Sequence, residues 1–484
     1  MNDIRQLLAL LPLMIPAAAA VLILLVLAVG RRHGVSAAIA WIGLAGGLAA
    51  AIVLPHLRGV MPRAVTDLLL IDRFAMGFAA LIYLSALAAA VLSRGYLRLG
   101  QPWPDEYYVL LLLASVGAAA LAAAAHLASL VLGMELLTVS LYGLIAYDRS
   151  RRGVEAGIKY LVLAGASSAL LIFGAALLYA ETGRMSLVAL AQHALTAPAP
   201  PPVFLAGAAL LLVGLGFKLA LAPMHLWAAD VYQGAPAPVT AVVASVSKAA
   251  ALAALLRLTV HLSPPPAAWA AGLSALAVLS MVLGNLLALR QLNLKRIIAY
   301  SSIAHLGYVL VAVRVGGPGG LEAAGFYIAT YILAVLGALG VVTVLSNRRG
   351  EPQHLDDYRG LAWRRPALAG LLTLCMISLA GLPISVGFVG KVYLVVAGVR
   401  GGQWPLVVTL MATSAAGLYY YARVILALFV RPEDAGAAPA SAELPPRVGL
   451  AAGAVLALLG LAILGLGLWP GPLADAVRYF VHLP

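Results

Sequence analysis

The chain has 484 residues, of which 63% are hydrophobic and only 10% are charged, and its mean hydropathy is +1.01. A soluble domain carries about 25% charged residues, so this composition excludes a water-soluble fold and predicts an all-α protein that crosses a lipid bilayer many times. The formal net charge of +13 would suggest nucleic acid if the chain were soluble. The basic residues lie in short segments between apolar stretches, which is typical of membrane proteins, so no nucleic-acid partner is expected.

The sequence offers no motif for a cofactor. The single cysteine, Cys375, lies inside an apolar run, so neither a disulfide framework nor a thiolate metal cluster is expected. There is no dinucleotide-binding glycine fingerprint, no Walker loop and no Cys or His cluster suited to haem or iron–sulfur ligation. We therefore expect this chain to bind no metal and no cofactor of its own.

Apolar stretches recur along the whole chain. A transmembrane helix needs about 20 predominantly apolar residues, and the sequence predicts about fourteen spans. The first span precedes Arg31 and Arg32, which is the reverse of a signal peptide, so it is expected to remain in the membrane. In chain order the predicted spans are residues 7–29, 35–55, 72–93, 107–125, 127–147, 156–181, 203–230, 236–261, 268–289, 296–314, 320–345, 366–399, 404–430 and 448–469.

The basic residues between the spans predict an orientation. With the N-terminus outside, the cytoplasmic connections hold seventeen basic residues and the external side holds seven. The positive-inside rule selects this arrangement. We expect a multi-pass protein of the bacterial inner (plasma) membrane with both termini on the periplasmic side, because fourteen spans is an even number.

Lysine and arginine are distributed differently. The chain has five lysines and 26 arginines, and four of the lysines lie inside predicted spans. Arginine does not release its proton in proteins, whereas lysine shifts its pKa readily when it is buried. Burial favours the neutral amine, and a nearby carboxylate favours the charged form. A site that loads and unloads a proton therefore needs lysine.

The fifth and sixth spans each contain a charged residue. Glu135 lies near the middle of the fifth span and is the obvious counter-charge for a buried lysine. Lys159 lies only a few residues into the sixth span. A side chain that snorkels to the interface explains Lys159 as well as a functional side chain does.

The seventh and eighth spans hold deeper lysines. Lys218 and Lys248 lie about a dozen residues into their spans, where a charge costs about 3 kcal/mol or more. Pro223 removes a backbone hydrogen bond, so it is expected to break the seventh helix beside Lys218 and His225. Intramembrane ionisable groups are functional by default, and we expect Lys218 and Lys248 to transfer protons.

The tenth span contains a polar island. It begins after Lys295 and includes Tyr300, Ser301 and His305. His305 could relay a proton between two halves of the protein. A lone buried histidine is as often simply hydrogen-bonded, so both interpretations stay open.

The twelfth span repeats the chemistry of the seventh. It combines Pro383, several glycines and Lys391 within about three turns, which predicts a second broken helix. The two breaks are five spans apart, and an odd number of spans returns a repeated unit in the opposite orientation. A matched pair of broken helices is typical of inverted-repeat transporters. We predict repeats in spans 4–8 and 9–13, with the chain divided at residues 1–103, 104–262, 263–431 and 432–484.

Several segments resemble the antiporter-like subunits of complex I, the proton-pumping NADH:quinone oxidoreductase, and in particular those of the subunit N type. The similarity covers essentially the whole chain. Relatives of the subunit M type carry glutamate where this chain has Lys391, and those of the subunit L type have a long C-terminal lateral helix. The segments that carry the resemblance are residues 133–137, 157–160, 218–227, 247–249, 293–296, 299–308 and 387–391.

The resemblance implies a proton-translocating membrane subunit of a translocase. Glu135 and Lys218 would form the key pair of one half-channel, and Lys248 would lead from it toward the centre. Lys391 would be the matching group of the second half. NADH, FMN, iron–sulfur clusters and quinone would be bound by partner subunits, and M-like and K-like subunits would be neighbours. Supporting roles fall to Lys159, His225, Lys295, Tyr300, Ser301 and His305.

A change in one ion pair is large enough to drive a proton step. Two charges 4 Å apart at an effective dielectric constant near 20 interact by about 4 kcal/mol. Moving one charge against 100 mV costs about 2.3 kcal/mol. We therefore expect the making and breaking of a Glu135–Lys218 contact to move a proton, with quinone reduction in partner subunits as the trigger.

Two other functions fit the same residues. A stand-alone or hydrogenase-associated cation/proton antiporter subunit would share the lysines, and Na⁺- or K⁺-dependent transport by the isolated chain would distinguish it. A static membrane scaffold would hold a Glu–Lys pair only for structural specificity. In that case the protonation of Glu135 would not change with pH or redox state.

Overall fold

The computed structural model describes residues 2–57, 60–99, 104–196, 200–260, 262, 265–348, 350–431 and 448–481. In chain order the elements are α1 (Asn2–Val29), α2 (His33–Val53), η1 (Leu54–His56), β1 (Arg63–Val65), β2 (Leu69–Ile71), α3 (Arg73–Leu97), α4 (Glu106–Ala122), α5 (Leu127–Ile145), α6 (Arg151–Thr182), α7 (Leu187–Thr196), α8 (Pro202–Leu219), α9 (Ala228–Gly234), α10 (Ala237–Ala244), α11 (Val246–Val260), α12 (Ala267–Leu289), α13 (Leu294–Val315), α14 (Gly317–Leu345), η2 (Leu355–Tyr358), α15 (Leu361–Arg364), α16 (Pro366–Ala380), α17 (Val386–Arg400), α18 (Trp404–Phe429), α19 (Leu450–Leu468) and α20 (Gly471–Val481).

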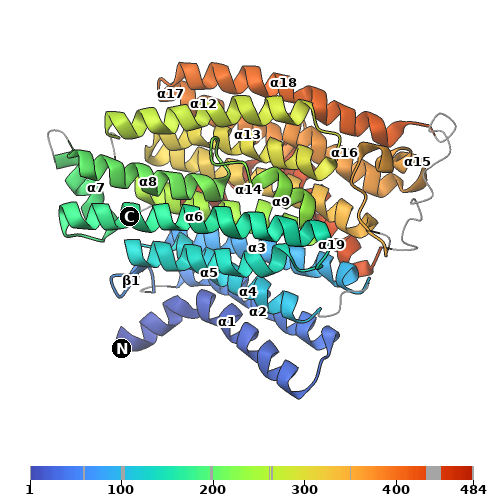
Figure 1. Ribbon diagram of the computed structural model, residues 1–484, viewed down its shortest axis with the longest axis horizontal. Coiled ribbons are helices and arrows are strands. Elements are labelled where there is room, and N and C mark those ends of the chain that lie inside the picture. The colour runs from blue at the N-terminus through green and yellow to red at the C-terminus, as the bar shows by residue number, and fades with distance from the viewer. Residues whose placement is uncertain are drawn as a thin grey trace.

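Long helices lie side by side along one direction, with α1 on one flank of the bundle and α18 on the opposite flank (Figure 1). Twelve helical segments of the described chain are long and apolar enough to cross a membrane. Two of the predicted spans fall outside these twelve. The fourth corresponds to α4, which has 17 residues, and the twelfth is divided into α16 and α17, of 15 residues each.

Both predicted helix breaks are present. The seventh span ends as α8 at Leu219 and resumes as α9 at Ala228, with Ala220 in the left-handed region at φ 58°. The twelfth span ends as α16 at Ala380, and Gly381, at φ 76°, turns the chain toward α17. Proline and left-handed residues stop helices because they remove donors or redirect the backbone.

A third, smaller interruption lies in the eighth span and was not predicted. Ser245 separates α10 from α11, and its hydroxyl donates to the carbonyl of Ala241 at 2.6 Å. Such back-bonding to the carbonyl four residues earlier bends helices. The sequence signal is weak, because the surrounding alanines and valines predict an uninterrupted span.

The predicted all-α fold class is confirmed, and the structure adds small elements that the sequence did not indicate. Strands β1 and β2 pair antiparallel as a short hairpin before α3. Two further helices, α7 and α20, were not predicted because each is too short to span a bilayer. Helix α20 packs back on the bundle, where Val477 and Val481 contact the backbone position of Gly325 in α14.

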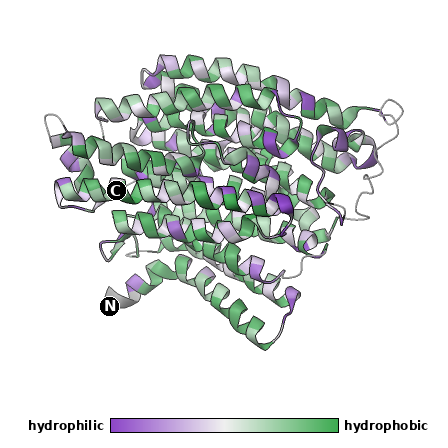
Figure 2. Cartoon of the chain, in the orientation of Figure 1, coloured by the Kyte–Doolittle hydropathy of each residue, from purple (hydrophilic) through white to green (hydrophobic). Residues whose placement is uncertain are grey.

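The centre of the bundle is formed by α10, α11, α13 and α14, which are almost completely buried. The outer helices expose large apolar side chains such as Ile42, Phe173 and Leu461, as a surface toward lipid requires. Figure 2 shows hydrophobic colouring along most of the outer helices. The central helices carry Lys248 and His305, so these polar groups lie where lipid does not reach.

A buried ion pair attaches the first three spans to the bundle. The guanidinium of Arg257, near the end of α11, donates to both oxygens of Asp72 at 2.9 and 3.0 Å. Asp72 is also the N-cap of α3 and accepts from the amide of Ala75, while Arg257 donates to the carbonyl of Ala122. One charge pair therefore joins α3, α4 and α11.

The orientation and the four-part division of the chain stay predictions. The segment of residues 432–447 lies outside the described residues. So do Arg58, Arg349 and Arg447, which were counted for the orientation.

Candidate functional site

The amine of Lys218 is held inside the protein by hydroxyl groups. Lys218 lies in the last turn of α8 and is only 1% exposed. Its Nζ donates to Thr138 Oγ1 at 2.6 Å and to Tyr160 OH at 2.9 Å, and these side chains belong to α5 and α6. A polar cavity of about 10 Å³ adjoins the amine, which is space for about one water molecule.

The first helix break supplies a partner for Lys248. Because α8 ends at Leu219, the carbonyl of Lys218 receives no helical hydrogen bond from Ala222, whose amide donates instead to Ser280 Oγ at 2.9 Å. The Nζ of Lys248, completely buried on α11, donates to this free carbonyl at 3.0 Å. It also lies 4.9 Å from the centre of the Trp227 ring. The break thus brings Lys218 and Lys248 together.

The expected contact between Glu135 and Lys218 is not present. Glu135 is half-buried on α5 and makes neither an ion pair nor a hydrogen bond with any residue that the structure describes. Its neighbours Leu132 and Val139 are 66% and 58% exposed, so this part of the helix faces away from the bundle. Thr138, about one turn further along α5, receives the hydrogen bond of Lys218 instead.

The second helix break holds Lys391 in the same way. Lys391 is 9% exposed, and its Nζ donates to the carbonyls of Leu379 and Ala380 at 3.1 and 2.6 Å. It also donates to Ser414 Oγ on α18 at 2.7 Å. The last carbonyls of a helix have no intrahelical donors and carry partial negative charge. Both Lys248 and Lys391 are therefore placed at the carbonyl end of a broken helix.

His305 is the centre of a network of tyrosines. Its Nδ1 is 2.7 Å from Tyr327 OH, and its Nε2 is 2.9 Å from Tyr421 OH. The hydroxyl of Tyr421 also bonds to Ser301. Three helices, α13, α14 and α18, contribute these groups. His305 is therefore hydrogen-bonded on both nitrogens and not isolated.

Further hydroxyl groups extend the network, and sequence reasoning missed most of them. Tyrosines in otherwise apolar spans, four residues apart in the case of Tyr327 and Tyr331, are the signal that could have found them. Two triads flank His305, one formed by Tyr232, Ser302 and Tyr331 and the other by Asn285, Tyr308 and Tyr420.

Two further lysines, Lys295 and Lys159, differ from Lys218, Lys248 and Lys391 because they form ion pairs with carboxylates. Lys295 is buried but forms an ion pair with Glu351 at 2.5 Å. Lys159 is 44% exposed and pairs with Glu155 at 2.8 Å and with Asp230 at 2.9 Å. The environment of Lys159 matches a side chain that reaches an interface. Both lysines have close carboxylates, which stabilise a permanent charge.

The remaining predicted groups take less central positions. His225 lies at the first break and is 8% exposed, and its Nδ1 has no hydrogen-bond partner in the described part of the chain. Tyr300 is half-buried, with the guanidinium of Arg296 6.0 Å from its ring centre. Among the residues that the structure describes, no three His, Cys, Asp or Glu side chains gather as a metal site would require.

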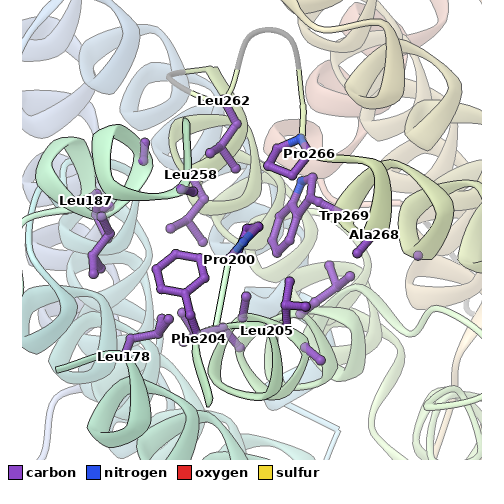
Figure 3. Close-up of a pocket in the computed structure, with 18 residues that line it drawn as sticks. Leu178, Leu187, Pro200, Phe204, Leu205, Leu258, Leu262, Pro266, Ala268 and Trp269 are labelled. Carbon is purple, nitrogen blue, oxygen red and sulfur yellow. The ribbon is translucent and has the colours of Figure 1, made fainter. Parts of the chain in front are cut away.

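A separate apolar cavity of about 310 Å³ lies between α6, α7, α8, α11 and α12. Figure 3 shows side chains such as Phe204, Leu258 and Trp269 pointing into it. Among the residues that the structure describes, no titratable side chain lines this cavity. It is therefore not part of the polar network.

Comparisons with known proteins agree with this geometry. Residues 124–417 match the family model for the transmembrane region of NADH:quinone oxidoreductase and Mrp antiporter proteins. Proteins named NADH-quinone oxidoreductase subunit N from Methylococcus capsulatus and Chromohalobacter salexigens are each 44% identical to this chain. The first alignment covers 97% of this chain and 94% of the Methylococcus protein. The second covers 98% of this chain and 99% of the Chromohalobacter protein.

Solved structures show the same similarity. A chain of Thermus thermophilus respiratory complex I with bound aureothin is 36% identical, with a TM-score of 0.82 over 97% of this chain and 99% of that one. A chain of an archaeal membrane-bound sulfane sulfur reductase is 27% identical, with a TM-score of 0.84 over 98% and 97%. A chain of the Mrp complex from Dietzia sp., 23% identical with a TM-score of 0.85 over 99% and 97%, has the same fold. The chain belongs to the NADH:quinone oxidoreductase/Mrp antiporter membrane family.

Proposed function

We propose that this chain is the subunit N-type, proton-translocating membrane subunit of an NADH:quinone oxidoreductase. The names of its close relatives and its match to a complex I chain support this function. In this proposal the chain performs no redox chemistry, and NADH, FMN, iron–sulfur clusters and quinone are bound by partner subunits.

One observation carries the proposal. Lys218, Lys248 and Lys391 are buried, and their amines contact only neutral oxygens, with no carboxylate within 4.0 Å among the described residues. Removing an unpaired amine from water disfavours its charge, so a modest change in the local field can move its proton. A static scaffold would pair such a charge permanently, as Arg257 and Asp72 do.

The buried groups suggest a route. A proton would pass from Lys218 to Lys248 at the first break, then along the hydroxyl network around His305, and finally to Lys391 at the second break. Water would join the groups that are not directly hydrogen-bonded. Glu135 would act on Lys218 from the surface of the chain, as a charge whose gain or loss changes the field at the amine.

The two breaks also support the proposed inverted repeat. Each break ends a helix within the bundle and presents its last carbonyls to a lysine amine. The lysines differ in their order along the chain, because Lys218 precedes its break and Lys391 follows its own. The assignment of spans 4–8 and 9–13 to the two repeats is part of the proposal. So are an inner-membrane location with both termini outside and M-like and K-like neighbours.

The test measures protons and electrons separately. The purified complex carrying Glu135→Gln or Lys218→Ala is reconstituted in proteoliposomes, and NADH oxidation and proton uptake are recorded together. We expect the number of protons per NADH to fall in both variants while the complex still assembles. The matched control is Glu181→Gln, which removes the charge of another half-buried carboxylate, near the C-terminal end of α6. This variant should pump normally. Normal stoichiometry in both test variants would contradict the proposal.

A cation-transport function predicts a different result. If the chain moves Na⁺ or K⁺ in exchange for protons, uptake by proteoliposomes that contain the isolated chain should depend on those cations. Under the proposed function, replacing Na⁺ and K⁺ with choline leaves the proton signal of the complex unchanged.

A further inference from the structure

A second apolar depression is a groove between α2, α3, α14 and α19. Its volume is about 650 Å³. Ile42, Leu84 and Leu458 line it and are 72%, 47% and 65% exposed, so the groove opens onto the outer surface. Of the described residues, no charged side chain lines it, and the one hydroxyl that does, that of Ser85, donates to the carbonyl of Leu81 within α3.

A basic residue stands at one end of this groove. Arg94 follows Leu87 and Val91, which both line the groove, by seven and three residues on α3, and this spacing places it on the same face of the helix. Its guanidinium lies 5.3 Å from the centre of the Trp41 ring, which lines the groove. Its Nη2 lies close to Gly34 in the first turn of α2, where an added Cβ atom would be 3.9 Å from it. The groove therefore has the guanidinium of Arg94 at the C-terminal end of α3 and apolar side chains along the rest of its length.

Two buried donors at this end, Arg94 Nε and Trp41 Nε1, have no hydrogen-bond partner among the described residues. The side chain of Arg94 makes no ion pair and no hydrogen bond with the described residues, and its Nε is buried. The indole Nε1 of Trp41 is also buried without an acceptor. A buried donor without an acceptor costs about 1–3 kcal/mol, and more when it is charged. Acceptor oxygens of another molecule would satisfy these two donors.

The chemistry of that molecule follows from the two parts of the site. The groove has space for a flexible hydrocarbon chain, and the guanidinium and the indole N–H can donate to oxygens that carry negative charge. Arginine binds phosphate through its planar fork of donors. Basic pockets between transmembrane helices on the cytoplasmic side are suited to anionic lipid headgroups.

We propose that this groove binds an anionic phospholipid, with an acyl chain between α2, α3, α14 and α19 and the phosphate at Arg94 and Trp41. The leaflet is the cytoplasmic one if the proposed orientation holds, because α2 begins and α3 ends on that side. The inference does not depend on proton translocation by the buried lysines. The bound lipid would stabilise the packing of α19 against α2 and α3.

The apolar cavity of Figure 3 provides an internal comparison. Trp269 lines that cavity and also has a buried indole Nε1, but in the described part of the chain this donor has no acceptor and no charged side chain lines the cavity. A lipid chain that enters there has no reason to be anionic. Selectivity for a charged headgroup should therefore be confined to the groove at Arg94.

The test uses the purified complex and two photoreactive lipids that differ only in the headgroup. Phosphatidylglycerol and phosphatidylcholine with the same diazirine-labelled acyl chain are added separately, irradiated, and located by mass spectrometry of peptides. We expect peptides of α2, α3 and α19 to be labelled about fivefold more by phosphatidylglycerol, the equivalent of ~1 kcal/mol for one basic residue near the surface. Arg94→Gln should remove this preference, and Arg94→Lys should retain most of it.

Two controls keep the result specific. Trp41→Phe retains the ring but removes the donor, so it should weaken labelling by phosphatidylglycerol, whereas Trp269→Phe should leave labelling of the groove unchanged. Equal labelling by both lipids, or a preference that survives Arg94→Gln, would overturn the proposal. Absence of label from α2, α3 and α19 with either lipid would also overturn it, because the groove would then be covered by protein.

Discussion

At the scale of single residues, the chain assigns lysine and arginine to different tasks. Lys218, Lys248 and Lys391 contact hydroxyl and carbonyl oxygens. Arg257 is fixed by a carboxylate, and Arg423 donates to the carbonyls of Leu289 and Gln291 at 2.8 Å each. An amine can lose its proton at these sites, whereas a guanidinium keeps its charge.

Exchanging lysine and arginine tests this division. Lys391→Arg retains a positive charge and hydrogen-bond donors but cannot release a proton. We expect it to lower proton pumping more than tenfold in proteoliposomes while the complex assembles. Arg423→Lys is the reciprocal control, because a fixed charge is sufficient there, and pumping should fall by less than about twofold. Normal pumping by Lys391→Arg would mean that the charge at this position is static.

At the scale of elements, the helix breaks create the site. Each break leaves carbonyl groups without the hydrogen bonds that a continuous helix would provide. A lysine amine donates to them, from α11 at the first break and from α17 at the second. The breaks are held by tertiary packing, because an exposed backbone at this depth would have no partners in lipid.

The second break can be disturbed selectively. Gly381 has φ 76°, and a Cβ there would lie 2.8 Å from Lys391 Nζ. Gly402 has φ 69° and open space around it. Alanine costs about 1 kcal/mol or more at either position because of the left-handed backbone. We expect both variants to lower thermal stability similarly, but only Gly381→Ala to reduce pumping several-fold. Equal pumping by both would separate the break from function.

The link between α3 and α11 should behave as a buried ion pair. Asp72→Ala leaves Arg257 buried without its partner, which should destabilise the chain by about 3–5 kcal/mol. The expected readout is a lower unfolding temperature of the purified complex. The double variant Asp72→Leu/Arg257→Leu removes both charges and should recover part of the loss. If the double variant is no better than the single one, the pair matters for packing and not for charge compensation.

At the scale of the whole molecule, polar chemistry is confined to the centre. Helices α11, α13 and α14 are surrounded by other helices, so their ionisable groups are shielded from lipid and from bulk water. The outer helices only need to match the bilayer. This separation explains how a chain with so few charges can hold several of them deep inside.

The proposed orientation can be measured on intact cells. The only natural cysteine, Cys375, is completely buried, so new cysteines report alone. Arg184, between α6 and α7, and Arg151, at the start of α6, are both exposed and lie at opposite ends of one helix. Arg184→Cys should react with an impermeant maleimide from outside, and Arg151→Cys only after the membrane is opened. The reverse pattern would invert the topology.

The sequence by itself determined that the chain lies in a lipid bilayer, where most of the helices are, and where the seventh and twelfth spans are broken. Apolar length, proline and glycine act locally, so they can be read from a short stretch of chain. It also identified Lys218, Lys248 and Lys391 as deep residues, and the structure confirms that they are buried.

Only the tertiary structure decided the partners of these residues. Sequence reasoning paired Lys218 with Glu135, whereas the amine is held by Thr138 and Tyr160. The supporting role predicted for Lys295 stays a prediction, and the structure adds that Glu351 pairs with it. The sequence did not indicate the tyrosines that α14 and α18 bring to His305. Periodicity places a side chain on one face of a helix. Which other helix meets that face depends on how the whole bundle packs.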